Sequence, residues 1–439
     1  MTKYIENNAL STYKFNPRGL KAIIFIGVFS SLVSIGFLMI GGDVSPGFKV
    51  FFNFIWYPFV GLGYCISAIA IGFDVYTHKH LTFKQYIYKN RFFYFCFYTC
   101  AIISIIIFII TLTILRNRND NLVQLGILAN KNDPLLGWGT NPKNWYGFVF
   151  LYTLLPLANY NVIGTTFVVT LFWFNLFGFL IINFLNKFGF FWNTLLIVIL
   201  VTYCFFTHIC LSIATENEAV GKANPWLFEV FRYSGIINTM TLFYFGLYMR
   251  KYIRIWKFKF SLITLGVLTL SAIVIQTVLD FTYYKKIVFD FILANAYASP
   301  LILILSWLWL NTFLGYNTND KRSNSKFINQ FNKLTNHIGF CYPLWFQLVG
   351  WTSTFVFGYL FINIIGKVDI NPSWYQSIKL SFKLSAEQNN SVFVSLIFFN
   401  LIIIPAVYYY PAKFMVFALR KIDQGIANKR ESKVNKYYQ

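Results

Sequence analysis

The chain has 439 residues, of which 57% are hydrophobic, 21% are aromatic and only 12% are charged, and its mean hydropathy is +0.56. A soluble globule cannot cover so large an apolar fraction, so the composition predicts a protein that crosses a membrane several times. The formal charge of +22 does not indicate a nucleic-acid partner, because the basic residues punctuate apolar runs instead of gathering on one wettable face. We expect membrane lipids as partners, no nucleic acid, and a multi-pass location in the plasma membrane.

Apolar runs near the roughly 20 residues needed to cross a hydrocarbon core recur along the chain. These runs are 22–40, 51–73, 92–115, 162–185, 191–213, 231–249, 260–279, 287–314, 338–365 and 392–419. They predict an all-α fold, a polytopic transmembrane helical bundle of about ten spans. A shorter run at 148–157 is interpreted as the outer approach to the fourth span or as a re-entrant piece.

The basic residues between these runs predict the orientation, since Lys and Arg concentrate in cytoplasmic loops. With the N-terminus inside, every strongly basic loop falls on the cytoplasmic side, including 74–91, 250–259 and 420–439. A further full span at 148–157 would move 250–259 to the outer side, so we reject it. Both termini are therefore expected in the cytoplasm.

The same patterns predict the domain organisation. A single transmembrane domain is expected over residues 1–419, followed by a basic cytoplasmic tail at 420–439. The segments expected outside the spans are a cytoplasmic leader at 1–21, a basic inner interfacial segment at 74–91, a long outer loop at 116–161 and a polar inner loop at 317–336. No cleavable signal peptide is expected, because mostly polar residues precede the first span.

The junction after the second span organises the rest of the chain. The span is rich in small residues, among them Gly63, Ala68 and Gly72, which let neighbouring helices approach closely. Residues 77–91, which we name the ledge, follow it and carry Lys and Arg. We expect the ledge to be a helix along the inner interface, since apolar or aromatic residues recur at helical spacing opposite its lysines. These are Phe83, Tyr86 and Ile87, with Asn90 completing the stripe.

Polar residues at membrane depth are costly and therefore candidates for function. His208, near the outer end of the fifth span, is a candidate general base, or else a helix-packing hydrogen bonder. Glu229 and Arg232 lie three residues apart at the start of the sixth span, where they line an outer substrate path or simply neutralise each other. The six cysteines show no ligand spacing, so no metal site is expected. The chain also has no HExxH, no nucleophile-elbow GxSxG and no P-loop.

Four short segments, taken in order, resemble the acyltransferase-3 family of membrane acyltransferases. They are the basic motif at 17–22 (PRGLKA), the small-residue run at 59–67 (FVGLGYCIS), the ledge motif at 83–91 (FKQYIYKNR) and the late motif at 338–345 (IGFCYPLW). The sequence departs from the family pattern at three places. Residues 28–34 lack the histidine that follows the first motif in the family, Lys21 replaces the first-motif arginine, and Tyr94 stands where a second ledge arginine is expected.

The resemblance implies an integral membrane O-acyltransferase. It would transfer an acyl group, in most cases acetyl, from cytoplasmic acyl-CoA as co-substrate to a hydroxyl of a glycan or lipid acceptor at the outer face. Cations near the inner side are suited to the coenzyme phosphates, because guanidinium and ammonium groups make charge-assisted bonds to them. The candidates are Arg18, Lys21, Lys89 and Arg91. His208 is the candidate substitute for the missing histidine.

The alternative is a non-catalytic or degenerate family member that transports a lipid or small solute. In that interpretation the ledge contacts anionic lipid head groups instead of a coenzyme. A transporter is expected to have broken helices or repeat symmetry around a central site, whereas an acyltransferase is expected to have a path from the ledge to a protonatable group at mid-depth.

Overall fold

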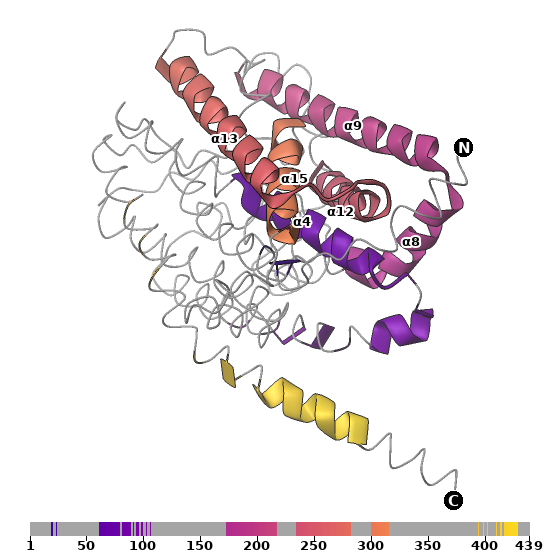
Figure 1. Cartoon of the computed structure of the whole chain (residues 1–439). Helices are drawn as coiled ribbons and strands as arrows, with labels where there is room; N and C mark the ends of the chain where they lie inside the picture. Colours follow the sequence, from indigo (N-terminus) through magenta and orange to yellow (C-terminus); the bar gives the residue numbers. More distant parts are fainter. Residues whose placement is uncertain are drawn as a thin grey trace, which may run out of the picture.

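The computed structural model describes residues 61–79, 81–88, 173–216, 234–281, 300–315 and 417–428, together with isolated residues within 19–23, 91–106 and 394–414. The regular elements of this part are all helices, with no strand among them, as Figure 1 shows. The expectation of an all-α fold is confirmed for the described residues.

Six helices form the described bundle. They are α4 (Gly61–Tyr76), α8 (Gly178–Lys187), α9 (Phe190–Glu216), α12 (Ser234–Tyr252), α13 (Phe258–Phe281) and α15 (Pro300–Gly315). Three of them, α9, α12 and α13, begin and end within a few residues of the predicted runs 191–213, 231–249 and 260–279. Long uninterrupted apolar runs, with basic residues or short polar breaks at their ends, account for this agreement.

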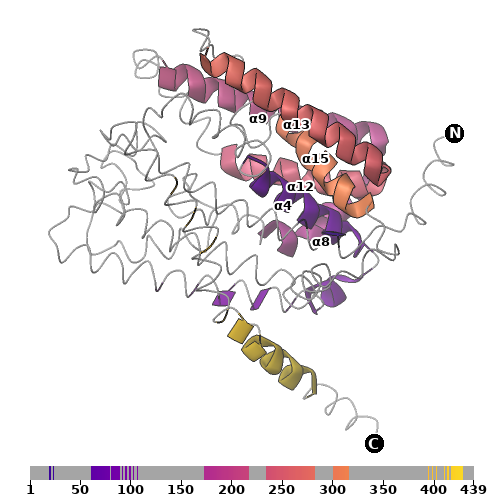
Figure 2. The same ribbon diagram turned by 60° about the vertical axis from the view of Figure 1, so that its left-hand side comes forward.

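The centre of the bundle is the crossing of α4 with α12 (Figures 1 and 2). Two glycines bring the backbones together there: a Cβ built on Gly72 would overlap the carbonyl oxygen of Phe243, and a Cβ built on Gly246 would overlap that of Ile69. The predicted role of small residues in the second span is thus confirmed at Gly72. Gly246, which the sequence analysis did not single out, is its counterpart on α12.

A second pair, α13 with α15, packs beside this crossing, and α15 also contacts α4. Polar groups join the pair: the Ser261 hydroxyl donates to the carbonyl oxygen of Leu308 (3.1 Å), and the backbone N–H of Trp256 donates to Oδ1 of Asn311 (3.2 Å). The Trp256 and Trp307 rings meet edge to face, with centroids 4.4 Å apart. These contacts fix the turn between α12 and α13 against α15.

One face of α13 is apolar and open. Val267, Val274 and Val278 are each more than half exposed, whereas Ser261, Leu265 and Ala272 on the other face are buried. Residues Phe258–Ile275 form the one window among the described helices that is both long and apolar enough to cross a membrane. The other predicted spans, and the total of ten, stay predictions.

Candidate functional site

The ledge begins with a turn and continues as a short helix. The backbone N–H groups of Thr77, His78 and Lys79 donate to carbonyls three residues earlier at 3.0–3.2 Å, so the expectation of a helix over the whole ledge is wrong at these residues. Local side chains explain the turn, since Oγ1 of Thr77 (2.6 Å) and Nδ1 of His78 (3.0 Å) both bond the carbonyl oxygen of Asp74. Such local bonds compete with continued helix.

A capping box restarts the helix at 83–88. The backbone N–H of Thr82 donates to Oε1 of Gln85 (3.0 Å), and the backbone N–H of Gln85 donates to the Thr82 hydroxyl (3.4 Å). Of the predicted stripe, Tyr86 is buried and Ile87 is half-buried, but Phe83 is 52% exposed and contacts the ring of Phe179. Asn90 lies outside the described residues.

Tyr86 fastens this helix to the segment that leads into α8. Its hydroxyl donates to the carbonyl oxygen of Asn175 (2.6 Å), and the Tyr94 hydroxyl donates to Oδ1 of the same residue (3.2 Å). Gly178 makes room for the ring, because a Cβ there would lie 2.9 Å from the Tyr86 hydroxyl oxygen. Burial raises the pKa of Tyr86, so the hydroxyl stays protonated at neutral pH and continues to donate.

Arg91 is the predicted coenzyme-binding residue that the structure describes in full. Its guanidinium lies over the Tyr88 ring at 3.6 Å from the centroid, and its Nε and Nη2 both donate to the carboxylate of Asp423, with 3.0 Å between Nη2 and Oδ2. The third nitrogen, Nη1, is buried and has no hydrogen-bond partner among the residues that the structure describes. One edge of the guanidinium is therefore occupied by Asp423, and the other retains donor capacity.

Two cations at the end of α12, Arg250 and Lys251, contact the neighbouring helices α4 and α8. The Arg250 guanidinium lies 5.3 Å from the centroid of the Phe73 ring; burial lowers its pKa, and the neighbouring Tyr76 raises it. Nζ of Lys251 donates to the carbonyl oxygen of Leu185 (2.9 Å), near the end of α8. A cation at a helix C-terminus satisfies an open carbonyl and complements the helix dipole. Lys251 thus has a structural role in addition to the orientation role predicted from its charge.

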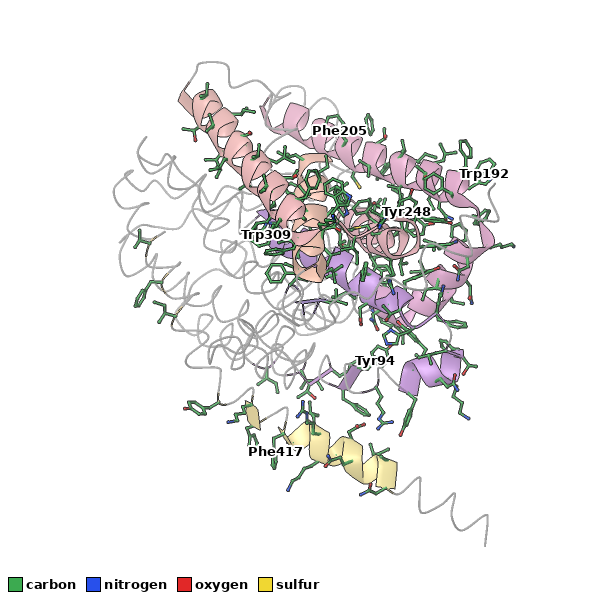
Figure 3. All side chains as sticks on the ribbon, in the orientation of Figure 1. Tyr94, Trp192, Phe205, Tyr248, Trp309 and Phe417 are labelled. Atoms are coloured by element: carbon green, nitrogen blue, oxygen red, sulfur yellow. The ribbon has the colours of Figure 1, made fainter. Side chains whose placement is uncertain are left out.

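Asn193 is the buried polar centre between α8, α9 and α12. Its Nδ2 lies 2.8–3.1 Å from the carbonyl oxygens of Leu185, Phe188 and Gly189, which end or follow α8. Its Oδ1 accepts from the Tyr244 hydroxyl, and its Nδ2 lies 3.0 Å from the Tyr252 hydroxyl. Tyr248, labelled in Figure 3, adds a contact from its hydroxyl to that of Thr194 (2.8 Å). This cluster closes the sharp connection between α8 and α9.

The remaining predicted site residues are described only in part or not at all. His208 lies on α9, eighteen residues after Phe190, so its Cα is about 27 Å along the axis from the start of that helix at 1.5 Å per residue. Its side chain lies outside the described residues. So do five other predicted residues, Arg18, Lys21, Lys89, Glu229 and Arg232. Among the side chains that are described, no group of three His, Cys, Asp or Glu could hold a metal ion.

The sequence analysis missed three residues that organise this region: Asn175, Asn193 and Asp423. Asn175 and Asn193 are single amides within or beside apolar runs, and the cost of burying an amide is the signal that could have found them. Asp423 is the one acidic residue in the otherwise basic stretch 410–428. Its partner Arg91 is 332 positions away, so the hydrophobic periodicity of a helix or strand could not have predicted the pair.

Comparison with known proteins gives no relative from which to transfer a role. No protein-family model, no curated protein and no solved structure matches the chain.

Proposed function

We propose that this chain is an integral membrane O-acyltransferase that uses cytoplasmic acyl-CoA, with acetyl-CoA as the first substrate to test. The acceptor is a hydroxyl of a glycan or lipid at the outer face. Both parts of the proposal come from the acyltransferase-3 resemblance, and the following observations support them.

The membrane placement is supported by where the apolar side chains lie. Beyond α13, the helices α8 and α9 also present large apolar side chains outward, such as Leu180 (58% exposed) and Trp192 (60% exposed, labelled in Figure 3). Contiguous exposed apolar surface of this kind is rare in soluble monomers and marks contact with lipid or protein. With the hydropathy of the whole chain, it favours lipid and several spans.

The observation that carries the coenzyme site is the buried Nη1 of Arg91, which finds no hydrogen-bond partner within the described part of the chain. A buried polar group without a hydrogen-bond partner requires an explanation, and a guanidinium nitrogen on a basic ledge is suited to a phosphate oxygen. Lys84, which is exposed, contributes to the overall positive charge of the ledge. The coenzyme phosphates would bind to Arg91 from the side opposite Asp423, with Lys89, Lys21 and Arg18 as the additional cations.

The transfer step needs a base and an acceptor hydroxyl. The hydroxyl oxygen attacks the thioester carbonyl carbon, a C–O bond forms and the C–S bond breaks. His208 takes the hydroxyl proton, and the departing thiolate of the coenzyme takes up a proton. Because His208 lies far along α9 from the inner end, it would meet an acceptor that enters from the outer side.

The expected topology can be tested with single cysteines at Lys257, in the exposed turn between α12 and α13, and at Asn217, immediately after α9. A membrane-impermeant maleimide added to intact cells should label the cysteine at 217, and that at 257 should react only after permeabilisation, because the basic loop 250–259 is expected inside. Labelling of both positions from the same side would contradict the ten-span arrangement.

The proposed reaction can be tested by following a radiolabelled acetyl group from acetyl-CoA to material in membranes that contain the protein. Wild-type protein should label a lipid or glycan fraction, and His208→Ala should lose about two to four orders of magnitude in rate, the range for a general base. A Thr207→Ala variant is the control, since it alters the neighbouring position without removing a base. Full transfer by His208→Ala would remove His208 as the base, and no transfer by wild type to any fraction would favour the transporter alternative.

A further inference from the structure

The C-terminal helical segment 417–428 lies apart from the bundle of α4 to α15, on the side of the ledge (Figures 1 and 2). Its ion pair with the ledge is that of Asp423 with Arg91. Phe417, labelled in Figure 3, is at its start. The segment is thus a surface element that an ion pair joins to the ledge.

The two sides of this segment differ in exposure. Leu419, Asp423 and Ala427, spaced four residues apart, are half-buried and share the side that carries the bond to Arg91. Ile422 and Ile426, one turn apart, are 56% and 44% exposed, and so apolar side chains face away from the protein. Phe414, a described residue shortly before this segment, is 72% exposed. Burying an exposed Ile or Phe side chain is worth roughly 1.5–3 kcal/mol, so this side favours an apolar surface.

Charge determines which apolar surface fits. Lys413 and Lys421 are both exposed, and the Nζ of Lys421 lies 4.9 Å from the centroid of the Phe417 ring. The one acid within 410–428, Asp423, is already paired with Arg91. The free surface of the segment is therefore cationic, which repels a second copy of the same segment and attracts anionic lipid head groups.

We propose that segment 417–428 is an interfacial helix that binds an anionic membrane surface. Ile422, Ile426 and Phe414 insert at the boundary between head groups and acyl chains, and Lys413 and Lys421 contact lipid phosphates. The ion pair of Arg91 with Asp423 holds the helix beside the ledge. The proposal goes beyond acyl transfer and needs from it only the membrane placement.

The test uses the full-length protein in nanodiscs, in a background without reactive native cysteines, and an environment-sensitive fluorophore on single cysteines. The probe positions are Ile422→Cys on the apolar side and Gln424→Cys, its matched control on the polar side. Val267→Cys on the open face of α13 is the positive control. Quenching by a lipid with a spin label near the head group is measured in phosphatidylcholine discs with and without phosphatidylglycerol.

Quenching at position 422 should exceed that at 424 by about twofold or more. It should increase with phosphatidylglycerol and decrease at high salt or after Lys421→Gln, because the attraction is electrostatic. Equal quenching at 422 and 424, with strong quenching at 267, would overturn the proposal and leave the membrane placement intact. No quenching at 267 would overturn both the proposal and the membrane placement. A loss of quenching at 422 that depends on protein concentration instead of lipid composition would indicate contact with a second copy, and it would also contradict the proposal.

Discussion

Gly246→Ala should destabilise the protein by about 1–3 kcal/mol, the usual cost of overpacking, or more. The added methyl group would overlap the carbonyl oxygen of Ile69 and lie 2.9 Å from the backbone nitrogen of Phe73. Backbone atoms of a helix cannot rotate away as a side chain can, so α4 and α12 must separate. The measurement is the fraction of detergent-solubilised protein that remains monodisperse after heating.

The matched control is Gly266→Ala on α13, the same substitution in a helix where a Cβ meets nothing within 4 Å. Alanine is a better helix former than glycine by roughly 0.5–1 kcal/mol, so this variant should be unchanged or more stable. Combining Gly72→Ala with Gly246→Ala should cost less than the sum of the single changes, since one separation of the helices relieves both overlaps. Equal stability of the Gly246→Ala and Gly266→Ala proteins would refute the glycine-mediated crossing.

Arg91→Ala should weaken acetyl-CoA binding about 10- to 150-fold, which corresponds to the 1.5–3 kcal/mol of charge-assisted hydrogen bonds. Asp423 neutralises this guanidinium through Nε and Nη2, and its charge repels a phosphate that approaches Nη1. Asp423→Asn removes the repelling charge and should therefore tighten binding, provided that Arg91 is present.

Lys84→Ala is the control for this pair of variants. It removes an exposed cation from the helix at 83–88 without touching the guanidinium, so binding should change by less than about 1 kcal/mol. Unchanged binding by Arg91→Ala would remove the ledge from the coenzyme site. Weaker binding by Asp423→Asn would show that the carboxylate positions Arg91 instead of repelling the phosphate.

The sequence predicted the helices best where nothing interrupts them. The breaks between α8 and α9 and between α12 and α13 lie at the polar or basic residues that separate the predicted runs, and Asn186 and Lys187, the last residues of α8, mark the first of them. The described part of the eighth run is α15, which covers its second half. Periodicity and composition carry this kind of information because it is local.

The partners of the candidate site residues could not be predicted from the sequence. The position of Arg91 on a basic ledge indicated an anion site, yet its contact with Asp423 depends on how the tail meets the ledge. The turn at Thr77–Lys79 arises from two side chains that bond one carbonyl, a preference that the apolar stripe does not reveal. The role of Asn193 is set by three carbonyls at the end of a neighbouring helix. Such long-range and polar contacts leave no periodic trace in the sequence.

The central claim is that acyl-CoA binds at the ledge of a membrane protein, and calorimetric titration of acetyl-CoA into the purified wild-type protein in nanodiscs tests it most directly. The account predicts saturable binding that competes with free coenzyme A, weakens with increasing salt and is reduced by Arg91→Ala. An absence of binding by folded wild-type protein, or binding with the same affinity in the Arg91→Ala protein, would contradict it.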